Sequence, residues 1–362
     1  MLSTTDDLRI KEIKELSLPA EVMGEIPRTL TATRVVMAAR NAIHAILTGS
    51  DDRLLVIVGP CSIHDPDAAI DYAGRLAALR ERLADRLEIV MRVYFEKPRT
   101  TVGWKGLIND PGLDNNSFDI NKGLRLARSV LSAVNNLGLP AGCEFLDMTT
   151  PQYIADLVAW AAIGARTTES QIHRELASGL SCPVGFKNGT DGNIRIAADA
   201  VKSAAHPHHF MAVTKGGRSG IAATTGNEDC HIILRGGSGP NYDAAHVEQA
   251  SAELIKSGLP ARLMIDTSHA NSSKKPENQP LVAADVGRQL AAGEQRIMGV
   301  MIESHLVAGR QDVKPGVALT YGQSITDGCI GWDTTVEVLE QLADAVAARR
   351  AAQRNSPRER SA

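Results

Sequence analysis

After residue 50, the chain alternates short apolar segments with longer segments in which apolar residues recur every three or four positions. The short segments are typical of buried parallel strands, and the spacing in the longer ones is typical of amphipathic helices. Eight strands, each followed by a helix, predict an α/β fold, specifically a (β/α)8 TIM-type barrel. A doubly wound open sheet is the alternative that the same alternation allows. The predicted strands are 54–58, 89–95, 141–146, 161–165, 184–186, 231–234, 263–266 and 298–302.

Residues that favour helix ends mark several of the predicted helices. Asp65-Pro66 and Thr150-Pro151 each place a capping side chain before a proline at the first helical position. An apolar stripe from Leu124 to Val134 stops at Gly138, and glycine suits a helix C-terminus. Further helices are predicted over 170–178, 192–204, 242–257, 280–292 and 333–351.

Three segments depart from the alternation and divide the chain. Residues 1–50 form an N-terminal extension, with a helix over 31–48 that ends at Gly49. Residues 51–351 form the barrel, and within them 209–226 predict a β-hairpin inserted before the sixth strand, because two apolar runs flank a glycine-rich turn. Residues 352–362 are rich in arginine and serine, and we expect them to be a disordered tail.

Composition is that of a soluble globular protein, with 43% apolar residues, 22% charged residues and a net charge of −3. No apolar run is long enough to cross a bilayer, and the N-terminus lacks the apolar core of a signal peptide. The five cysteines include no Cys-x-x-Cys pair, which favours a reducing compartment. We therefore expect a cytoplasmic protein without a membrane partner.

Cationic side chains follow four of the predicted strands. Arg92 and Lys97 come after one strand, and Arg166, Lys187 and Arg235 each come after another. The carboxyl ends of barrel strands meet at one mouth, where barrel enzymes keep their active sites. Cations gathered there, in a chain that is not basic overall, suit a small and highly anionic substrate better than nucleic acid.

Four potential metal ligands also lie at or just after strand ends. Cys61 follows the first strand, His269 the seventh and Glu303 the eighth, and Asp327 lies in the segment beyond. Because these strands are neighbours in a closed barrel, their thiolate, imidazole and two carboxylates can converge on one Mn²⁺, Fe²⁺, Co²⁺ or Zn²⁺ ion. Taken alone, Cys61 also fits a buried packing residue, and His269 also fits a structural histidine.

Six short motifs together resemble one enzyme family: Gly59–His64, Glu96–Thr101, Gly164–Gln171, Gly185–Thr190, Ile233–Gly237 and Ser268–Ser272. They resemble the type I 3-deoxy-D-arabino-heptulosonate 7-phosphate (DAHP) synthases, and the likeness extends from about Asp6 to near Arg350. The resemblance implies condensation of phosphoenolpyruvate with erythrose 4-phosphate and water, the first step of the shikimate pathway. It also implies a divalent metal, for which we favour Mn²⁺, and a homo-oligomer, either a dimer or a tetramer.

The resemblance implies roles for the cationic residues at the barrel mouth. Arg166, Arg235 and the backbone N–H of Ala165 would hold the phosphate of phosphoenolpyruvate. Removing so anionic a molecule from water requires several fixed cations. The carboxylate would be held by Arg92, Lys97 and Lys187.

The remaining implied roles concern the second substrate and the chemistry. Arg99 and Thr100 would hold the phosphate of erythrose 4-phosphate. Lys97 would protonate the developing alkoxide, and Glu144 would orient the attacking water. His269 would contribute to catalysis as one of the four metal ligands, which are Cys61, His269, Glu303 and Asp327.

Two other functions compete with this one. The first is 3-deoxy-octulosonate 8-phosphate synthase, which joins phosphoenolpyruvate to arabinose 5-phosphate on a related barrel. The Lys97–Thr101 block and the long N-terminal extension argue against it. The second is a catalytically inactive subunit that senses an aromatic amino acid, and the complete set of catalytic residue types argues against that.

The extension and the hairpin imply feedback regulation, because a barrel needs neither for catalysis. In the resembling family they build a pocket for an aromatic amino acid, partly with the arm of a neighbouring subunit. We favour phenylalanine, from the arm Asp6–Ile10, over tyrosine. Position 212 leaves tyrosine open, because it is alanine where the phenylalanine class tends to have serine and the tyrosine class glycine. The matching positions are Asp7, Ile10, Met148, Gln152, Ser181, Phe210, Ala212 and Ala222.

Overall fold

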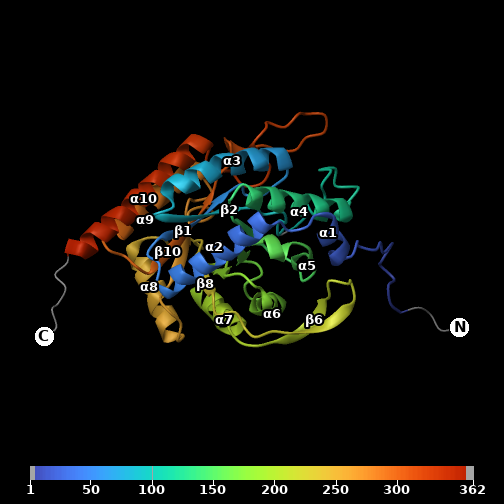
Figure 1. The fold of residues 1–362 in the computed structure, drawn as a ribbon, viewed down its shortest axis with the longest axis horizontal. Helices are drawn as coiled ribbons and strands as arrows, with labels where there is room; N and C mark the ends of the chain where they lie inside the picture. Colours follow the sequence, from blue (N-terminus) through green and yellow to red (C-terminus); the bar gives the residue numbers. More distant parts are fainter. Residues whose placement is uncertain (1–4, 100, 356–362) are drawn as a thin grey trace.

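A computed structural model describes residues 5–99 and 101–355. Its centre is a closed barrel of eight strands, in the order β1-β10-β9-β8-β5-β4-β3-β2, surrounded by helices (Figure 1). All neighbouring strands of the ring pair in parallel, so the predicted (β/α)8 barrel is confirmed and the open-sheet alternative is wrong. The barrel strands are β1 (Leu54–Gly59), β2 (Leu87–Arg92), β3 (Ala141–Glu144), β4 (Trp160–Ile163), β5 (Val184–Lys187), β8 (Cys230–Leu234), β9 (Leu263–Asp266) and β10 (Ile297–Glu303).

The helices begin and end largely where local chemistry predicts. Asp65 accepts hydrogen bonds from the backbone N–H groups of Asp67 and Ala68, and Gly49 adopts φ 81° at a helix C-terminus, where a side chain would be strained. The helices are α1 (Pro19–Glu25), α2 (Leu30–Thr48), α3 (Pro66–Leu83), α4 (Ile120–Asn136), α5 (Pro151–Ile154), α6 (Gln171–Gly179), α7 (Ile194–Ala204), α8 (Ala244–Lys256), α9 (Gln279–Ala291) and α10 (Trp332–Asn355), with 3-10 turns η1 (Ala155–Leu157) and η2 (Pro276–Asn278).

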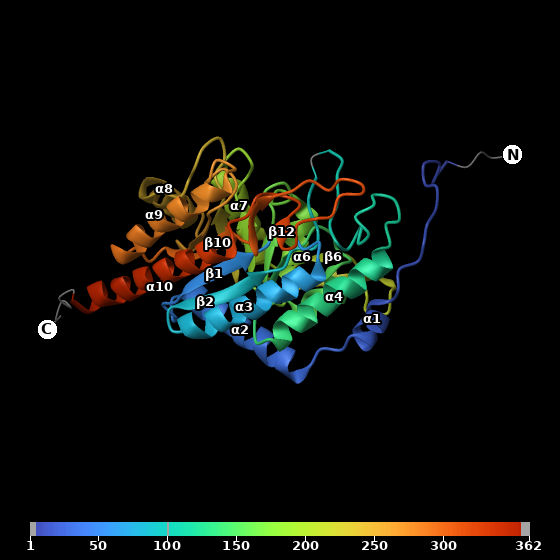
Figure 2. The ribbon, with the colours of Figure 1, turned by 90° about the horizontal axis from the view of Figure 1, so that it is seen from above.

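Helix α2 of the N-terminal extension lies across the barrel (Figure 1). Its Ile43 and Ile46 belong to the same buried cluster as Leu55, Trp160 and Met298, which fill the barrel interior. Burial of each large apolar side chain contributes about 2 kcal/mol to stability. The extension is therefore packed into the core through α2, whereas Figure 2 shows the segment before α1 extending away from the barrel.

Several strands end before their apolar sequence does. Strand β2 ends at Arg92 and β3 at Glu144, whereas the apolar pattern predicts ends at Phe95 and Leu146. Val93 and Phe95 remain buried although they lie beyond the strand. Burial continues past the last ladder pair, so hydrophobicity alone does not mark where a strand ends.

The predicted cap at Thr150 is wrong, although Pro151 does occupy the first position of α5. The Thr150 hydroxyl donates to the carboxylate of Asp147 at 2.6 Å instead. Asp147 also accepts from the backbone N–H groups of Thr149 and Thr150, so it organises this turn from further upstream.

The predicted hairpin is present as antiparallel strands β6 (His209–Val213) and β7 (Ser219–Ala223), between α7 and β8. A second small sheet, of parallel strands β11 (Val307–Arg310) and β12 (Gln323–Ser324), follows β10 and was not predicted. Helix α10 continues to Asn355, past the predicted boundary at 351. None of the helices within 5–99 and 101–355 combines the length and apolar character needed to cross a membrane.

Candidate active site

The carboxyl ends of the barrel strands open into a cavity of about 570 Å³. Its lining includes four of the five cations predicted from strand ends, namely Arg92, Arg166, Lys187 and Arg235. Each comes from a different strand or from the turn that follows it, so the barrel brings together side chains that are far apart in sequence. The fifth predicted cation, Lys97, does not line this cavity but contacts the metal-ligand candidates beside it.

Three of the four predicted metal ligands converge. The ligand atoms of Cys61, Glu303 and Asp327 all lie within 4.8 Å of one another. Strand register explains the first pair, because Gly59 at the end of β1 is directly opposite Glu303 at the end of β10. The Cys61 thiol donates to Asp327 at 3.5 Å. A thiol and two carboxylates in contact form a donor set that suits a divalent transition metal.

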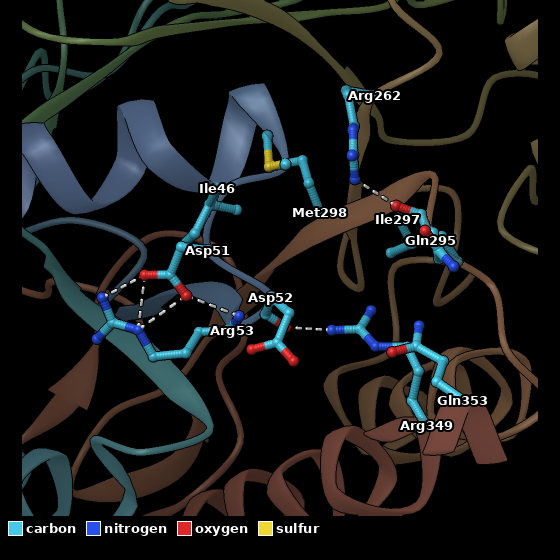
Figure 3. Close-up of a pocket in the computed structure, with 11 residues that line it drawn as sticks. Ile46, Asp51, Asp52, Arg53, Arg262, Gln295, Ile297, Met298, Arg349 and Gln353 are labelled. Atoms are coloured by element: carbon cyan, nitrogen blue, oxygen red, sulfur yellow. Dashed lines mark hydrogen bonds and ion pairs between the residues drawn. The ribbon is translucent and has the colours of Figure 1, made fainter. Parts of the chain in front are cut away.

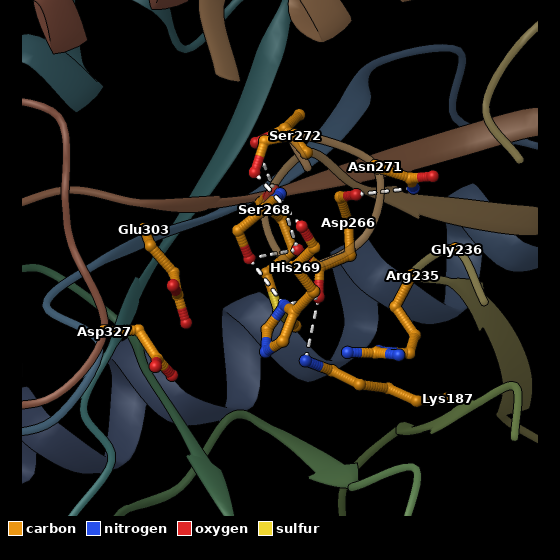
Figure 4. Close-up of polar contacts among 12 residues, drawn as sticks. Lys187, Arg235, Gly236, Asp266, Ser268, His269, Asn271, Ser272, Glu303 and Asp327 are labelled. Atoms are coloured by element: carbon orange, nitrogen blue, oxygen red, sulfur yellow. Dashed lines mark hydrogen bonds and ion pairs between the residues drawn. The ribbon is translucent and has the colours of Figure 1, made fainter. Parts of the chain in front are cut away.

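His269 lies outside this group of three, in the turn after β9. Its backbone is left-handed (φ 56°), and its Nδ1 lies 2.9 Å from Asp266 and 2.6 Å from the hydroxyl of Ser268. These contacts hold the ring and leave Nε2 for a ligand. In Figure 4, Nε2 points away from Ser268, and Glu303 and Asp327 are drawn to the left of the ring.

Lys97 joins the cations to the metal-ligand candidates. Its ammonium lies 3.0 Å from the sulfur of Cys61 and 3.9 Å from a carboxylate oxygen of Asp327. Burial, together with the negative charge of Glu303, raises the pKa of the Cys61 thiol. Burial acts to lower the pKa of Lys97, but the charges of Cys61, Glu303 and Asp327 outweigh it and raise that pKa. Burial also acts to raise the pKa of Asp327, and Lys97 and His269 hold it below its ordinary value.

Arg92 is almost completely buried and fixed on all sides. Its guanidinium donates to the carbonyls of Pro60 at 3.1 Å and Cys61 at 3.0 Å, and it lies 3.1 Å from Glu303. The guanidinium carbon is 3.7 Å from the centre of the Tyr94 ring, a cation–π contact. Its position is therefore set before any substrate binds, which lowers the entropic cost of binding an anion.

Lys187 is fixed in the same way by a buried carboxylate that sequence reasoning missed. Its ammonium lies 2.8 Å from Asp266, the fully buried last residue of β9 (Figure 4). Burial acts to raise the pKa of Asp266, but Lys187 and His269 hold it well below its ordinary value. The position of Asp266 at a strand end was the signal that could have identified it.

Arg166 and Arg235 form no ion pair with a carboxylate in the described part of the chain. Burial lowers the pKa of Arg235, and the nearby guanidinium of Arg166 lowers it further. The backbone N–H of Arg235 donates to Asn188 at 2.8 Å, which positions the strand end. Arg166 is exposed and Arg235 is half-buried, so both guanidiniums keep their donors for an anionic ligand of the cavity. Ala165, directly before Arg166, lines the same cavity.

Glu144 ends β3 and presents its carboxylate to the cavity. It lies so close to Gly164 that a Cβ there would approach within 2.2 Å of its Oε1. Only glycine at 164 leaves this carboxylate in place. Arg99 is exposed, donates to the carbonyl of Trp104 at 2.8 Å and does not line the cavity. Thr100 lies outside the described residues.

The predicted regulatory residues fall into two sets. Phe210 on β6 pairs directly with Ala222 on β7, and both are half-buried, as are Ala212, Met148 and Gln152. Lys215, at the hairpin tip, donates to the backbone carbonyl of Gln152, so the hairpin contacts α5. The second set, which is exposed in this single chain, consists of Asp7, Ile10 and Ser181.

Two further cations of the cavity were missed, Lys274 and Arg310. Lys274 closes the turn that begins at Ser268, so its proximity to that motif was a usable signal. Arg310 ends β11, a mostly exposed strand with no apolar pattern, and it pairs with Asp312. The sequence held no signal for it.

Comparison with known proteins identifies the family of this chain. Residues 29–340 match the model of the DAHP synthetase I family. The chain is 65% identical over 345 residues to the Phe-sensitive phospho-2-dehydro-3-deoxyheptonate aldolase of Escherichia coli strain K12, covering 95% of this chain and 98% of that protein. It is 58% identical to the phospho-2-dehydro-3-deoxyheptonate aldolase of Haemophilus influenzae, covering 97% of each. The solved structure of the Francisella tularensis aldolase of the same name superposes with a TM-score of 0.91 at 54% identity, covering 94% of this chain and 99% of that one. The chain belongs to the DAHP synthetase I family.

Proposed function

We propose that this chain condenses phosphoenolpyruvate with erythrose 4-phosphate and water to give DAHP and phosphate, the first step of aromatic amino acid biosynthesis. The observation that carries the proposal is one cavity that combines four cations with carboxylates of a possible metal site. A small trianionic substrate matches the cations, and an aldehyde oxygen matches a metal. Five free cysteines favour the cytoplasm as the compartment.

The phosphate of phosphoenolpyruvate binds at Arg166, Arg235 and the N–H of Ala165. Support comes from the two unpaired guanidiniums, because an arginine without a carboxylate keeps its donors for a ligand. The carboxylate binds between Arg92 and Lys187, whose positions are fixed by Glu303 and Asp266 respectively. Arg92 and Lys187 are already paired with carboxylates, whereas Arg166 and Arg235 are not. This difference would direct the phosphate of the substrate to the second pair and its carboxylate to the first.

The residues present fit a divalent metal. The thiol of Cys61 and the carboxylates of Glu303 and Asp327 lie within 4.8 Å of one another, and Glu303 Oε1 forms no hydrogen bond within the described residues, its nearest cation being the Arg92 guanidinium at 3.1 Å. We assign the ion to Cys61, Glu303 and Asp327, with Nε2 of His269 as the fourth ligand. Bound there, a divalent ion supplies Lewis acidity for the aldehyde of erythrose 4-phosphate. We favour Mn²⁺ as the ion. Fe²⁺, Co²⁺ and Zn²⁺ accept some of the same ligands.

The chain's own residues then carry the proton transfers. C3 of phosphoenolpyruvate forms a bond to the aldehyde carbon, and Lys97 protonates the resulting alkoxide. Glu144 orients a water that adds to C2, and the C2–O bond of the tetrahedral phosphohemiketal breaks to release phosphate. Arg99 and Thr100 hold the phosphate of the aldose. Since Arg99 lies outside the cavity here, this role requires the Arg99 side chain to turn toward the substrate.

Regulation belongs to the arm and hairpin, with phenylalanine as the inhibitor we favour because the 65% identical relative is Phe-sensitive. The hairpin tip already contacts the extension, since the N–H of Ala20 donates to the carbonyl of Lys215 at 2.9 Å. The exposed apolar residues of the arm and hairpin would be covered by a second copy of the chain, which supports a dimer or tetramer. They are Leu8, Ile10, Ile13, Leu16, Met211 and Ile221.

Phosphate release measured with phosphoenolpyruvate and either erythrose 4-phosphate or arabinose 5-phosphate tests the proposed reaction. We expect turnover with the four-carbon sugar and at least ~100-fold lower kcat/KM with the five-carbon sugar, because misplacing the reacting aldehyde is costly. A preference for arabinose 5-phosphate would contradict the proposal, and so would absence of turnover with both sugars in the presence of Mn²⁺.

A further inference from the structure

A second cavity, of about 50 Å³, lies where the barrel strands begin, opposite the catalytic mouth (Figure 3). Its walls come from the end of α2 at Gly49, from residues 51–53 before β1, from Arg262 before β9, from the start of β10 and from α10. A cavity of this size holds a few waters or one small oxyanion. Because five elements meet here, a ligand would connect the α2 extension to the barrel and to the last helix.

The acidic side chains of this cavity are already neutralised by other partners. Asp51 forms a two-bond ion pair with Arg53, at 2.9 and 2.7 Å. Asp52 forms a similar pair with Arg350 of α10, at 2.8 and 2.5 Å. Neither carboxylate is therefore free to serve another cation.

Arg262 and Arg349 line the same cavity and have no carboxylate partner in the described part of the chain. Arg262 donates only to the carbonyl of Gln295, at 2.7 Å, and Arg349 donates only to the carbonyls of Asp52 and Glu294. A guanidinium has five N–H donors, so most of them are unused in both residues. Arg349 is only 5% exposed, so water replaces few of its missing partners.

Helix C-termini offer an alternative explanation, because the end of α2 favours nearby cations. The observed acceptors do not support it. They belong to Asp52, which precedes β1, and to Glu294 and Gln295, which precede β10, and none is a carbonyl of the last turn of α2. Burial lowers the pKa of Arg349, and the charges of Arg350 and Arg262 add to this effect against the opposing charge of Asp52. The guanidiniums of Arg262 and Arg349 line one small cavity and repel each other, and a bound anion would relieve this repulsion.

We propose that this cavity is a binding site for one small tetrahedral oxyanion, such as inorganic phosphate or sulfate, bridged by Arg262 and Arg349. Charge-assisted hydrogen bonds from two guanidiniums are the usual protein ligands of such ions. The bound ion joins α10 to the segment before β9. The site is remote from the mouth, so the proposal does not depend on the reaction proposed above.

Equilibrium dialysis with labelled inorganic phosphate tests this site. The mouth also binds phosphate, so the background is the full chain carrying Arg99→Gln, Arg166→Gln and Arg235→Gln. In that background we expect about one phosphate to bind per chain at saturation. Sulfate should displace it, because sulfate has the same geometry, whereas an equal concentration of chloride should not. Adding Arg262→Gln weakens binding by at least ~10-fold, because one bridging cation is lost. The matched control is Arg288→Gln, since Arg288 is an exposed arginine of α9 and leaves binding unchanged.

Three results would overturn the proposal. The first is that the background variant binds no phosphate, and the second is that binding survives when Arg262→Gln and Arg349→Gln are combined. The third is an equal loss of affinity with Arg288→Gln, which would indicate a general charge effect. Thermal unfolding without phosphate shows whether each variant is folded before it is tested. Arg262→Gln alone keeps kcat/KM within about twofold of the unmodified chain, because distant sites act independently. A larger loss would place Arg262 in the catalytic machinery instead.

Discussion

The ammonium nitrogen of Lys97 lies 3.0 Å from the thiol sulfur of Cys61. This contact places the proposed acid directly beside the proposed metal ligands, which also include Asp327 at 3.9 Å from the same ammonium. Positive charge added at these ligands would make Lys97 a stronger acid, because like charges disfavour the protonated amine. A lysine that is held firmly protonated by the ligands alone would thereby become able to give up its proton during the reaction.

Cys61 is expected to be essential for metal affinity. Dialysis against a chelator should abolish turnover, and Mn²⁺ or Co²⁺ should restore it. Cys61→Ser should weaken metal binding by at least ~10-fold, because a hydroxyl is not ionised near neutral pH and is a poorer ligand than a thiolate. Metal content after dialysis at a series of free Mn²⁺ concentrations measures this directly. Cys143→Ser is the control, since the Cys143 thiol is buried and donates a hydrogen bond to the carbonyl of Val93. Unchanged metal affinity in Cys61→Ser would show that Cys61 is not a ligand.

Arg166 is expected to bind the phosphate of phosphoenolpyruvate. Loss of one partner of a desolvated charge pair costs on the order of 2–5 kcal/mol. Arg166→Ala should therefore reduce kcat/KM for phosphoenolpyruvate by at least ~30-fold, at ~1.4 kcal/mol per decade. Steady-state kinetics with Arg75→Ala as the comparison checks this, because Arg75 pairs with Asp71 on the exposed face of α3. A change under about threefold would place Arg166 outside the substrate pocket.

Much of the site could be predicted because, in a barrel, residues that follow a strand lie at the mouth. Residues that follow apolar strands, such as Arg92, Lys187 and Glu303, all end at one mouth whatever their separation in the sequence. That inference requires only the strand pattern. The register came from the structure, which pairs Gly59 with Glu303 on neighbouring strands.

What could not be predicted depends on contacts rather than on pattern. Arg310 ends a mostly exposed strand that is defined by the pairing of Val307 with Gln323. The short helix α1 has no apolar stripe long enough to stand out, and it is held by tertiary contacts such as that between Ala20 and Lys215. The turn before α5 depends on Asp147, whose role is visible only once its three hydrogen bonds are seen.

Stability should depend on pH through His44, which joins α2 to the segment before β8. Its Nδ1 lies 2.6 Å from Asp229, and this hydrogen bond and then the charge of Asp229 raise the pKa of His44. A raised folded-state pKa contributes stability that is fully present below the unfolded pKa and is lost as pH rises through the folded pKa. The contribution should be under ~1 kcal/mol, because the pair is partly exposed and screened. Thermal unfolding of His44→Gln should show a deficit near about pH 6 that vanishes near about pH 9, and a deficit of equal size at both would contradict this.

Arg128 of α4 is expected to anchor the N-terminal extension. It is fully buried, donates to the carbonyls of Ile26 and Tyr153 at 2.7 Å each, and pairs with Asp156 at 2.6 Å. Arg128→Met should lower the free energy of unfolding by about 3–5 kcal/mol, because it leaves two carbonyls and the carboxylate of Asp156, only 16% exposed, without their partner. Adding Asp156→Asn should recover part of that loss, since the unpaired charge is then gone. Denaturant unfolding of both variants measures the difference, and equal losses would mean that the carboxylate is not the cause.

Removal of residues 1–15 should separate regulation from catalysis. Within residues 5–15, only the carbonyl of Glu15 bonds to the barrel, through Asn121, whereas Ser17 just beyond the cut keeps its own bond to Asn121 at 2.7 Å. The truncated chain should therefore keep α1 and α2 in place and retain kcat within about twofold, because nothing that lines the mouth is lost. Inhibition by phenylalanine should disappear, since the arm is a wall of the proposed regulatory pocket. Initial rates of both chains across millimolar phenylalanine, tyrosine and tryptophan measure this. Inhibition retained in the truncated chain would place the pocket elsewhere, and an intact chain that none of the three inhibits would remove the regulatory role altogether.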